Sequence, residues 1–366
     1  MELNQECILL QGELRKFAQQ VILDKVDEFD KSCSVPSDSV KKLAEMGILG
    51  AVIPEDMGGA ALDTIGLVVS LEEISKVCPS TALIVAIHNA FAFSIVNFGS
   101  DAMQKKYLEN AASGEIIGGF ATTNTNELHI ERTDGSILLN GTNSLVLNAN
   151  MHGPFAIFLP TGAENKNLTA YVIDQDFPGM TIRKSETALG LKAAGIGIAS
   201  FANSSITNAS LIGTEEDGSK IYSAVCDLLN IYLAAIACGL AQGATEAAIK
   251  YAKERVQFGQ PIITFGMIRE KIADMTTQIE AGRLLTYNAA LTCDAGKNYS
   301  REASMAKYYM ARAAIDVANS AIQIFGGYGY MKDYPIERYF RDAQVINVLC
   351  STPADEKEKI AKEAIG

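Results

Sequence analysis

The glycines at positions 326, 327 and 329 are the residues whose spacing most directly suggests chemistry. They lie where a predicted helix ends, and glycines there let backbone N–H groups approach a phosphate closely. The spacing matches neither a Walker nor a Rossmann loop, so it does not define a nucleotide site alone. Residues 254–262 and 334–343 add arginines and aromatic side chains, but separately they also fit an ordinary helix end and a solvated helix face.

Several other kinds of site are disfavoured by the composition. The three histidines, His88, His129 and His152, lack the i, i+3 or i, i+4 spacing of helical metal ligands, so we expect no metal. The seven cysteines are scattered without a C-x-x-C pair, which favours a reducing cytoplasm over a disulfide framework. The net charge of −12 disfavours a nucleic-acid partner. No uninterrupted apolar run reaches the roughly 20 residues that a bilayer demands, so we expect no membrane span.

The spacing of apolar residues divides the chain into three predicted domains. Apolar residues recur every three or four positions over residues 1–115, which predicts a helical domain. Residues 116–220 are rich in Asn, Thr, Gly and Ser and carry short apolar runs, which predicts a β-barrel or sandwich with a hairpin turn at Asn140-Gly141. Long Ala-rich helical periods over residues 221–366 predict a four-helix bundle. The fold class is therefore α+β with several domains.

In this order and on these domains, residues 254–262, the glycines at 326–329 and residues 334–343 resemble the acyl-CoA dehydrogenase family. The resemblance covers essentially the whole chain, and it includes Pro-Glu-Asp-Met-Gly-Gly at 54–59, Gly-Phe-Ala-Thr-Thr at 119–123 and Leu-Asn-Gly-Thr at 139–142. It implies an FAD-dependent oxidoreductase whose cofactor lies between the β domain and the bundle. It also implies a homodimer or homotetramer, because a neighbouring subunit holds part of the FAD in this family.

The resemblance implies a set of FAD contacts. Arg255 and Phe258 match a contact at the end of the first bundle helix, where arginine can donate two parallel hydrogen bonds to phosphate oxygens. The hydroxyl that faces the flavin ring matches Thr123, and the family's Trp-Ile-Thr segment appears as residues 145–147. The expected contacts are Phe120, Thr122, Thr123, Leu145, Leu147, Arg255, Phe258, Gln323, Gly326, Gly327 and Thr352.

The sequence departs from the family at the catalytic base. Family members remove the α proton of an acyl thioester with a Glu while the flavin N5 takes the β hydrogen as hydride. Cys350 occupies the usual position of that Glu, and Leu229 occupies its alternative position on the first bundle helix. A thiol has an ordinary pKa near 8.5, so Cys350 would be mostly protonated at neutral pH. The sequence leaves open whether Cys350 is a base, a nucleophile or an apolar filler.

Substrate contacts also differ from the family pattern. Asp227 is retained as an expected substrate-binding residue, but Asn230 stands where the family has an arginine. The loop at 123–128 is shortened and lacks the serine that touches CoA. Asp355 and Glu356 follow Pro353, so we expect them to form a solvated helix start without a catalytic role.

Three functions follow from these departures. The first is FAD-dependent oxidation of an acyl thioester on an acyl carrier protein, as in the formation of hydroxymalonyl or aminomalonyl extender units for polyketides and nonribosomal peptides. Oxidation of an aldehyde or its hydrate needs hydride transfer but no α-proton abstraction, which would explain the lost Glu. The second is a conventional acyl-CoA dehydrogenase with a displaced base. The third is a flavoprotein scaffold without activity. The sequence identifies neither the acyl group nor the electron acceptor.

Overall fold

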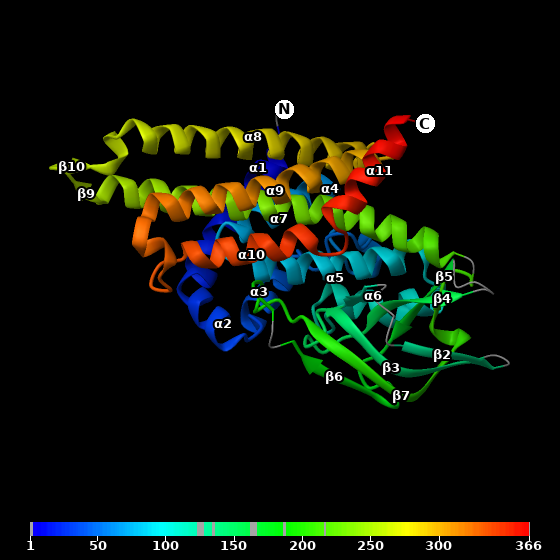
Figure 1. Ribbon diagram of the computed structural model, residues 1–366. Coiled ribbons are helices and arrows are strands. Elements are labelled where there is room, and N and C mark those ends of the chain that lie inside the picture. The colour runs from blue at the N-terminus through cyan, green and yellow to red at the C-terminus, as the bar shows by residue number, and fades with distance from the viewer. Residues whose placement is uncertain are drawn as a thin grey trace.

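The computed structural model describes residues 3–122, 128–133, 136–161, 167–185, 188–215 and 217–365. A helical part comes first, a curled β-sheet follows, and a long helical bundle ends the chain (Figure 1). The predicted α+β class and the order of its parts are confirmed. The predicted boundaries near 115 and 220 remain predictions; the nearest helix ends are Ala112, before the sheet, and Gly218, after it.

The N-terminal part is built around two apolar helices. Its helices are α1 (Gln5–Phe17), α2 (Val26–Ser32), α3 (Ser37–Glu45), α4 (Thr64–Ser75), α5 (Pro79–Phe98) and α6 (Asp101–Ala112). Asp63 and Ser100 start α4 and α6 by accepting hydrogen bonds from backbone N–H groups of the first turn. Helix α5 starts with Pro79 in its first turn, where a missing N–H costs nothing. Nearly all residues of α4 and α5 are buried, so both helices form the core of this part.

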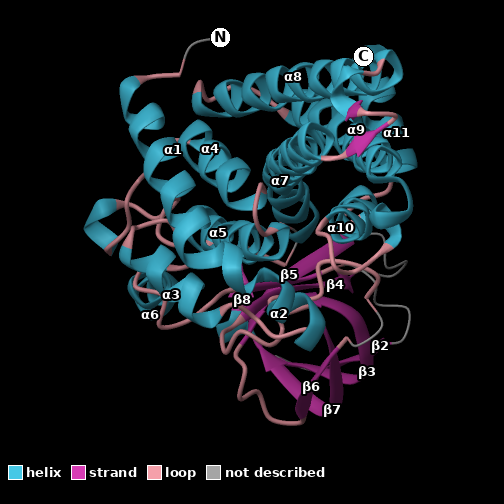
Figure 2. Cartoon of the chain, turned by 90° about the vertical axis from the view of Figure 1, so that its left-hand side faces the viewer, coloured by secondary structure: helices cyan, strands magenta, loops and turns pink. Residues whose placement is uncertain are grey.

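The middle part is one eight-stranded sheet in the order β6-β7-β3-β1-β4-β5-β8. Strand β2 pairs with the first half of β3, along the edge opposite β7. Its strands are β1 (Gly119–Ala121), β2 (Leu128–Thr133), β3 (Ser136–Leu147), β4 (Phe155–Thr161), β5 (Asn167–Ile173), β6 (Met180–Lys184), β7 (Gly197–Thr207) and β8 (Leu211–Ile212). Side chains alternate between two cores: Ala156 and Phe158 of β4 face the helices, while Ile157 and Leu159 pack inside the curl of the sheet. Figure 2 shows this sheet below the helices.

The predicted hairpin turn at Asn140-Gly141 is wrong. Both residues lie inside β3, where Asn140 pairs with His129 of β2. The register of β3 against β7 shifts between Leu139 and Gly141, which marks a β-bulge, and Gly141 has φ +110°. The Asn140 side chain accepts a hydrogen bond from the Asn203 N–H (2.8 Å). The positive φ that Asn-Gly supplies therefore serves a bulge instead of a turn.

The C-terminal part surrounds the 37-residue helix α7. Its elements are α7 (Gly218–Glu254), β9 (Val256–Gln257), β10 (Gln260–Pro261), α8 (Gly266–Asp294), α9 (Ser300–Phe325), α10 (Ile336–Val348) and α11 (Pro353–Ile365). Gly239 lets α7 approach α4, because a Cβ at that position would lie 2.1 Å from the Glu72 carbonyl oxygen. Helix α7 thereby joins the bundle to the N-terminal helices, and its N-terminal end packs on β5.

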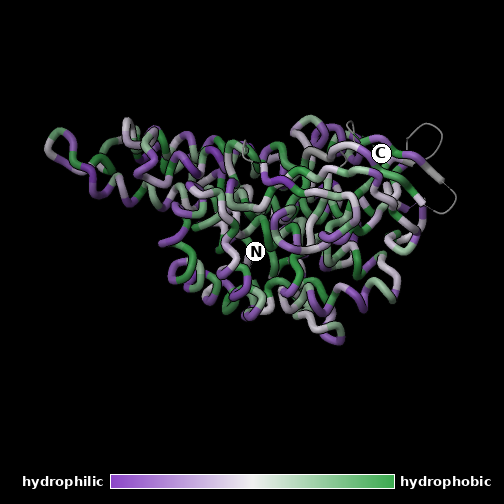
Figure 3. The backbone as a smooth tube through the Cα atoms, turned by 90° about the horizontal axis from the view of Figure 1, so that it is seen from below, coloured by the Kyte–Doolittle hydropathy of each residue, from purple (hydrophilic) through white to green (hydrophobic). Residues whose placement is uncertain are grey.

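Helices α5 and α7 are long and apolar enough to cross a membrane by length and composition alone. However, 78% and 89% of their apolar windows are buried inside the protein, which is typical of core helices. Figure 3 shows this distribution: hydrophobic segments gather inside the molecule and hydrophilic ones at its edges.

Candidate functional site

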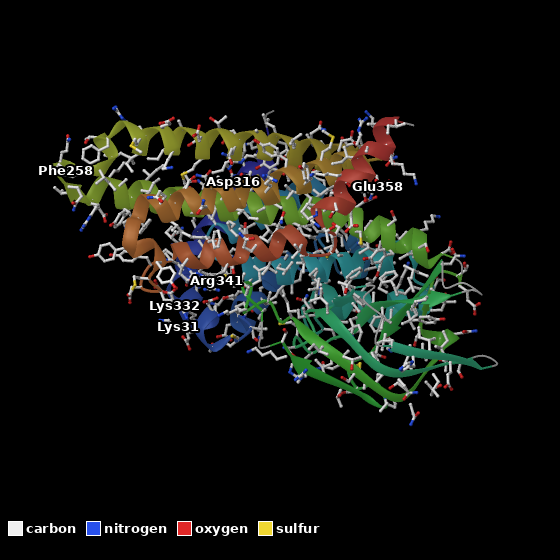
Figure 4. The ribbon with its side chains drawn as sticks, in the orientation of Figure 1. Lys31, Phe258, Asp316, Lys332, Arg341 and Glu358 are labelled. Carbon is white, nitrogen blue, oxygen red and sulfur yellow. The ribbon has the colours of Figure 1, made fainter. Side chains whose placement is uncertain are left out.

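The far end of the bundle brings together two of the segments that the sequence singled out. Helix α7 ends at Glu254, and the chain turns back through the short β9–β10 hairpin. Helix α9 ends beside it and continues as a 3₁₀ turn, Gly326–Tyr330. The guanidinium of Arg255 lies over the Tyr328 ring, 5.6 Å from its centroid. The Phe258 side chain is 93% exposed. Figure 4 shows it at the tip.

A cavity of about 540 Å³ opens between these segments. It is lined by Tyr251, Arg255, Gln257, Ile262, Ile324, Phe325, Gly326, Gly327, Tyr328 and Met331. Gly326 has φ +60°, and no atom lies within 4 Å of a Cβ added at Gly326 or Gly327. An arginine beside open glycine backbone suits a phosphate group, so the cavity fits the pyrophosphate part of FAD. Gln323 is exposed on α9 and, like Phe258, does not line the cavity.

The expected flavin contacts of the β domain lie on neighbouring strands. Thr122 follows β1, and its N–H and hydroxyl both donate to the Leu145 carbonyl (3.1 and 3.4 Å). Leu147 is fully buried and pairs with Phe120 across the strands. Phe120 faces the core, with the rings of Phe158 and Tyr222 at 5.4 and 6.0 Å. Its contact with FAD, like that of the other β-domain residues, remains a prediction, and Thr123 lies outside the described residues.

The turn between α10 and α11 carries Cys350. This residue is half-buried and has φ +64°, a left-handed conformation that is unusual for any residue but glycine. Burial raises the pKa of its thiol to about 11, although the neighbouring Lys307 ammonium lowers it. The thiol is therefore protonated at neutral pH and cannot serve there as an efficient base.

The expected substrate-binding residues are both engaged inside the protein. Asp227 forms an ion pair with Lys359 and accepts a hydrogen bond from Ser300. The Asn230 amide donates to Glu356 Oε1 (3.0 Å). The hydroxyl of Thr352 accepts from the Asp355 N–H (3.3 Å) and donates to the Asp355 carboxylate (2.7 Å), so this threonine caps α11. Whether any of them contacts a ligand remains a prediction.

A buried polar cluster beneath Cys350 was missed from the sequence. Lys307, 1% exposed, donates to the carbonyls of Leu349 (2.7 Å) and Ser351 (2.8 Å). Glu356 is 3% exposed, so the expectation of a solvated residue is wrong for it, while Asp355 is exposed as expected. One signal pointed to Lys307: it stands on the stripe of Ala303 and Met310, three to four residues from each, where α9 is otherwise apolar.

One chain does not bring all the expected FAD residues together. Figure 1 shows the β9–β10 tip at one end of the bundle, and α11 with the β-sheet toward the other. Figure 4 shows the same separation between Phe258 at the tip and Glu358 on α11.

Comparisons with known proteins cover the full length of the chain. Family models for the N-terminal and C-terminal domains of acyl-CoA dehydrogenases match residues 4–115 and 218–352. An acyl-CoA dehydrogenase of Bacillus subtilis is 35% identical over the whole of both chains. The structure of butyryl-CoA dehydrogenase from Megasphaera elsdenii superposes with a TM-score of 0.94 at 28% identity, covering 100% of both chains. The prolyl acyl carrier protein oxidase AnaB gives 0.93 at 26% identity, covering 99% of this chain and 100% of its own. The resemblance drawn from the sequence is confirmed.

Proposed function

The chain belongs to the acyl-CoA dehydrogenase family of FAD-dependent oxidoreductases, and on that premise we propose that it oxidises a small acyl thioester carried by an acyl carrier protein. The bound FAD supplies a hydride acceptor. The chain's own residues hold this cofactor, exclude water from the reacting carbon and orient the thioester. In the proposed reaction the substrate would lose a hydride from carbon, which FAD would accept when bound, and a proton from a hydroxyl group, which would pass to water, as in the oxidation of an alcohol or an aldehyde hydrate.

The observation that carries this proposal is that neither position of the family's base holds a carboxylate: one holds Cys350 and the other Leu229. Desaturation needs a base that removes an α proton at neutral pH, and a thiol with a pKa of about 11 is a poor one. Leu229, at the alternative position of the base, is fully buried and has no ionisable group. Oxidation at a hydroxyl-bearing carbon avoids the α-proton step.

One comparison supports a carrier protein as the source of the substrate. The chain shares its fold with a prolyl acyl carrier protein oxidase at 26% identity. We place the product in secondary metabolism, as an extender unit for polyketide or nonribosomal peptide assembly.

The proposed enzyme is a cytoplasmic homodimer or homotetramer. The separation of the β9–β10 tip from α11 supports a site that two subunits complete. Seven free cysteines support a reducing compartment.

A conventional acyl-CoA dehydrogenase is the second candidate. It is favoured by the 35% identity to the Bacillus subtilis acyl-CoA dehydrogenase over both full chains. This candidate requires a displaced base, and Glu356 is a buried carboxylate six residues beyond Cys350.

An anaerobic titration of the flavin absorbance band separates the two candidates. The FAD-loaded protein is mixed first with butyryl-CoA and then with carrier protein loaded with a seryl or glyceryl unit. Bleaching by the loaded carrier alone is the expected result. Bleaching by butyryl-CoA would overturn the proposal in favour of a conventional dehydrogenase, and no bleaching by either would favour a scaffold.

A further inference from the structure

A buried ammonium group binds both peptide carbonyls that flank Cys350. Lys307 of α9 donates to Leu349 O at 2.7 Å and to Ser351 O at 2.8 Å, and it also donates to the Ser351 hydroxyl. Each of its three protons therefore has an acceptor in the turn. A left-handed conformation at a non-glycine residue costs free energy, and these hydrogen bonds stabilise it.

Glu356 of α11 completes the cluster. Its Oε1 accepts from Asn230 (3.0 Å) and from the Ser351 hydroxyl, and it lies 3.8 Å from Lys307 Nζ. Its Oε2 is buried and has no hydrogen-bond partner among the described residues. The Glu356 carboxylate is therefore a counter-charge beside the buried Lys307 ammonium. Three helices, α7, α9 and α11, thereby meet at one turn.

We infer that Lys307 and Glu356 are positioning residues, which act through the turn that carries Cys350. Lys307 fixes the carbonyl groups of the residues on either side of Cys350. Glu356 holds Lys307 and Ser351 in place. Their importance for catalysis rests on the proposed function, in which the reaction takes place beside this turn.

The inference predicts opposite electrostatic effects of the two residues on Cys350. The titratable groups around this turn are Cys226 and Asp227 of α7, Lys307 of α9, and Asp355, Glu356 and Lys359 of α11. The Lys307 ammonium favours the Cys350 thiolate, whereas the Glu356 carboxylate disfavours it. Two residues that only filled space would not change the stability of the Cys350 thiolate in opposite directions.

The test is the rate at which iodoacetamide alkylates Cys350, followed by peptide mass spectrometry across a range of pH in the FAD-loaded protein. We expect Lys307→Met to slow alkylation at a fixed pH below the thiol pKa by about tenfold, the effect of one pKa unit. We expect Glu356→Gln to accelerate it several-fold, because glutamine keeps the hydrogen bonds and removes the charge. Cys33, a half-buried thiol at the end of α2, is the internal control in every sample.

Changes in the same direction, or no change in either variant, would overturn the inference. If Lys307→Met does not fold, Glu356→Gln alone still decides, because unchanged alkylation there contradicts the predicted coupling. Alkylation needs no substrate and no turnover, so this result is independent of whether the chain oxidises a carrier-bound thioester.

Discussion

At the scale of single residues, the proposed oxidation gives the Cys350 thiol no role as a base. Its thiol is protonated at neutral pH because burial raises its pKa to about 11. We expect Cys350→Ala to retain turnover of the loaded carrier protein within about threefold, whereas loss of a general base costs about 10²–10⁴-fold. Steady-state rates at saturating substrate test this prediction, with Cys226→Ala on α7 as the matched control. A loss of 100-fold or more would show that the thiol takes part in the chemistry.

His88 makes the stability of the protein sensitive to acid. Its Nδ1 accepts from the Gly118 N–H (2.9 Å), and complete burial lowers the pKa of the imidazole to about 4. The unfolded chain binds a proton near pH 6.5, so stability falls as the pH drops from about 6.5 toward 4. We expect a loss of about 2 kcal/mol between pH 7 and pH 5 from this group.

Urea unfolding midpoints at pH 7 and pH 5 measure this effect. His88→Gln keeps an acceptor for the Gly118 N–H but does not titrate, so its midpoint should change less with pH than that of the wild type. His152→Gln, at an exposed position, should behave like the wild type. Equal pH dependence in all three proteins would refute the assignment.

From the sequence, residues marked by a local pattern were easier to assign than isolated polar residues. Arg255 and Gly327 could be identified because a local pattern marks them, and both line one cavity. The burial of Glu356 could not, because it depends on Asn230 and Lys307, which are far away in the sequence. A helix that starts after Pro353 is expected to be exposed there unless another element covers it. The sequence does not show that Asn230 and Lys307 lie against Glu356.

At the scale of elements, a buried carboxylate helps to hold α10 on the β domain. Asp342, 2% exposed, accepts a hydrogen bond from the Leu191 N–H at 2.6 Å. Gly190 lies against α10, since a Cβ there would lie 2.4 Å from the Arg341 carbonyl carbon. The turn at position 350 follows α10 directly, so this contact orients the turn relative to the sheet.

We expect Asp342→Ala to lower the free energy of unfolding by about 1–3 kcal/mol, because it leaves the Leu191 N–H buried without an acceptor. Asp342→Asn is the matched control, since its side-chain oxygen can still accept the bond and should lose less. Urea denaturation of the two variants measures the difference. Equal losses would mean that the negative charge, and not the hydrogen bond, holds the contact.

The elements were predicted unevenly from the sequence. Long helices such as α8 and α9 follow from local apolar spacing, which predicts long helical periods over residues 221–366. The bulge at Asn140 was mistaken for a turn, because the register of β3 is set by β2 and β7 together. Local residue preference cannot tell whether the positive φ of Gly141 belongs to a turn or to a bulge.

At the scale of the whole molecule, the proposed cofactor site needs two copies of the chain. Arg255→Ala removes the guanidinium from the tip, so we expect FAD to bind about tenfold more weakly, the effect of one lost hydrogen bond to a charged group. Lys253→Ala, two residues earlier on α7, removes the same charge outside the cavity and should keep its FAD. The ratio of flavin absorbance to protein after gel filtration measures both. Equal FAD content in the two variants would contradict the site.

The central claim, oxidation without α-proton removal, is tested most directly by isotope effects on anaerobic flavin reduction. Carrier protein is loaded with a glyceryl unit that carries deuterium either at carbon 2 or at carbon 3, and stopped-flow absorbance gives the rate of bleaching. The account predicts that deuterium at carbon 3, the carbon that loses hydride, slows reduction, while deuterium at carbon 2 leaves it unchanged. Slower reduction with deuterium at carbon 2 would contradict the account, because it would show that the α proton is removed as the flavin is reduced.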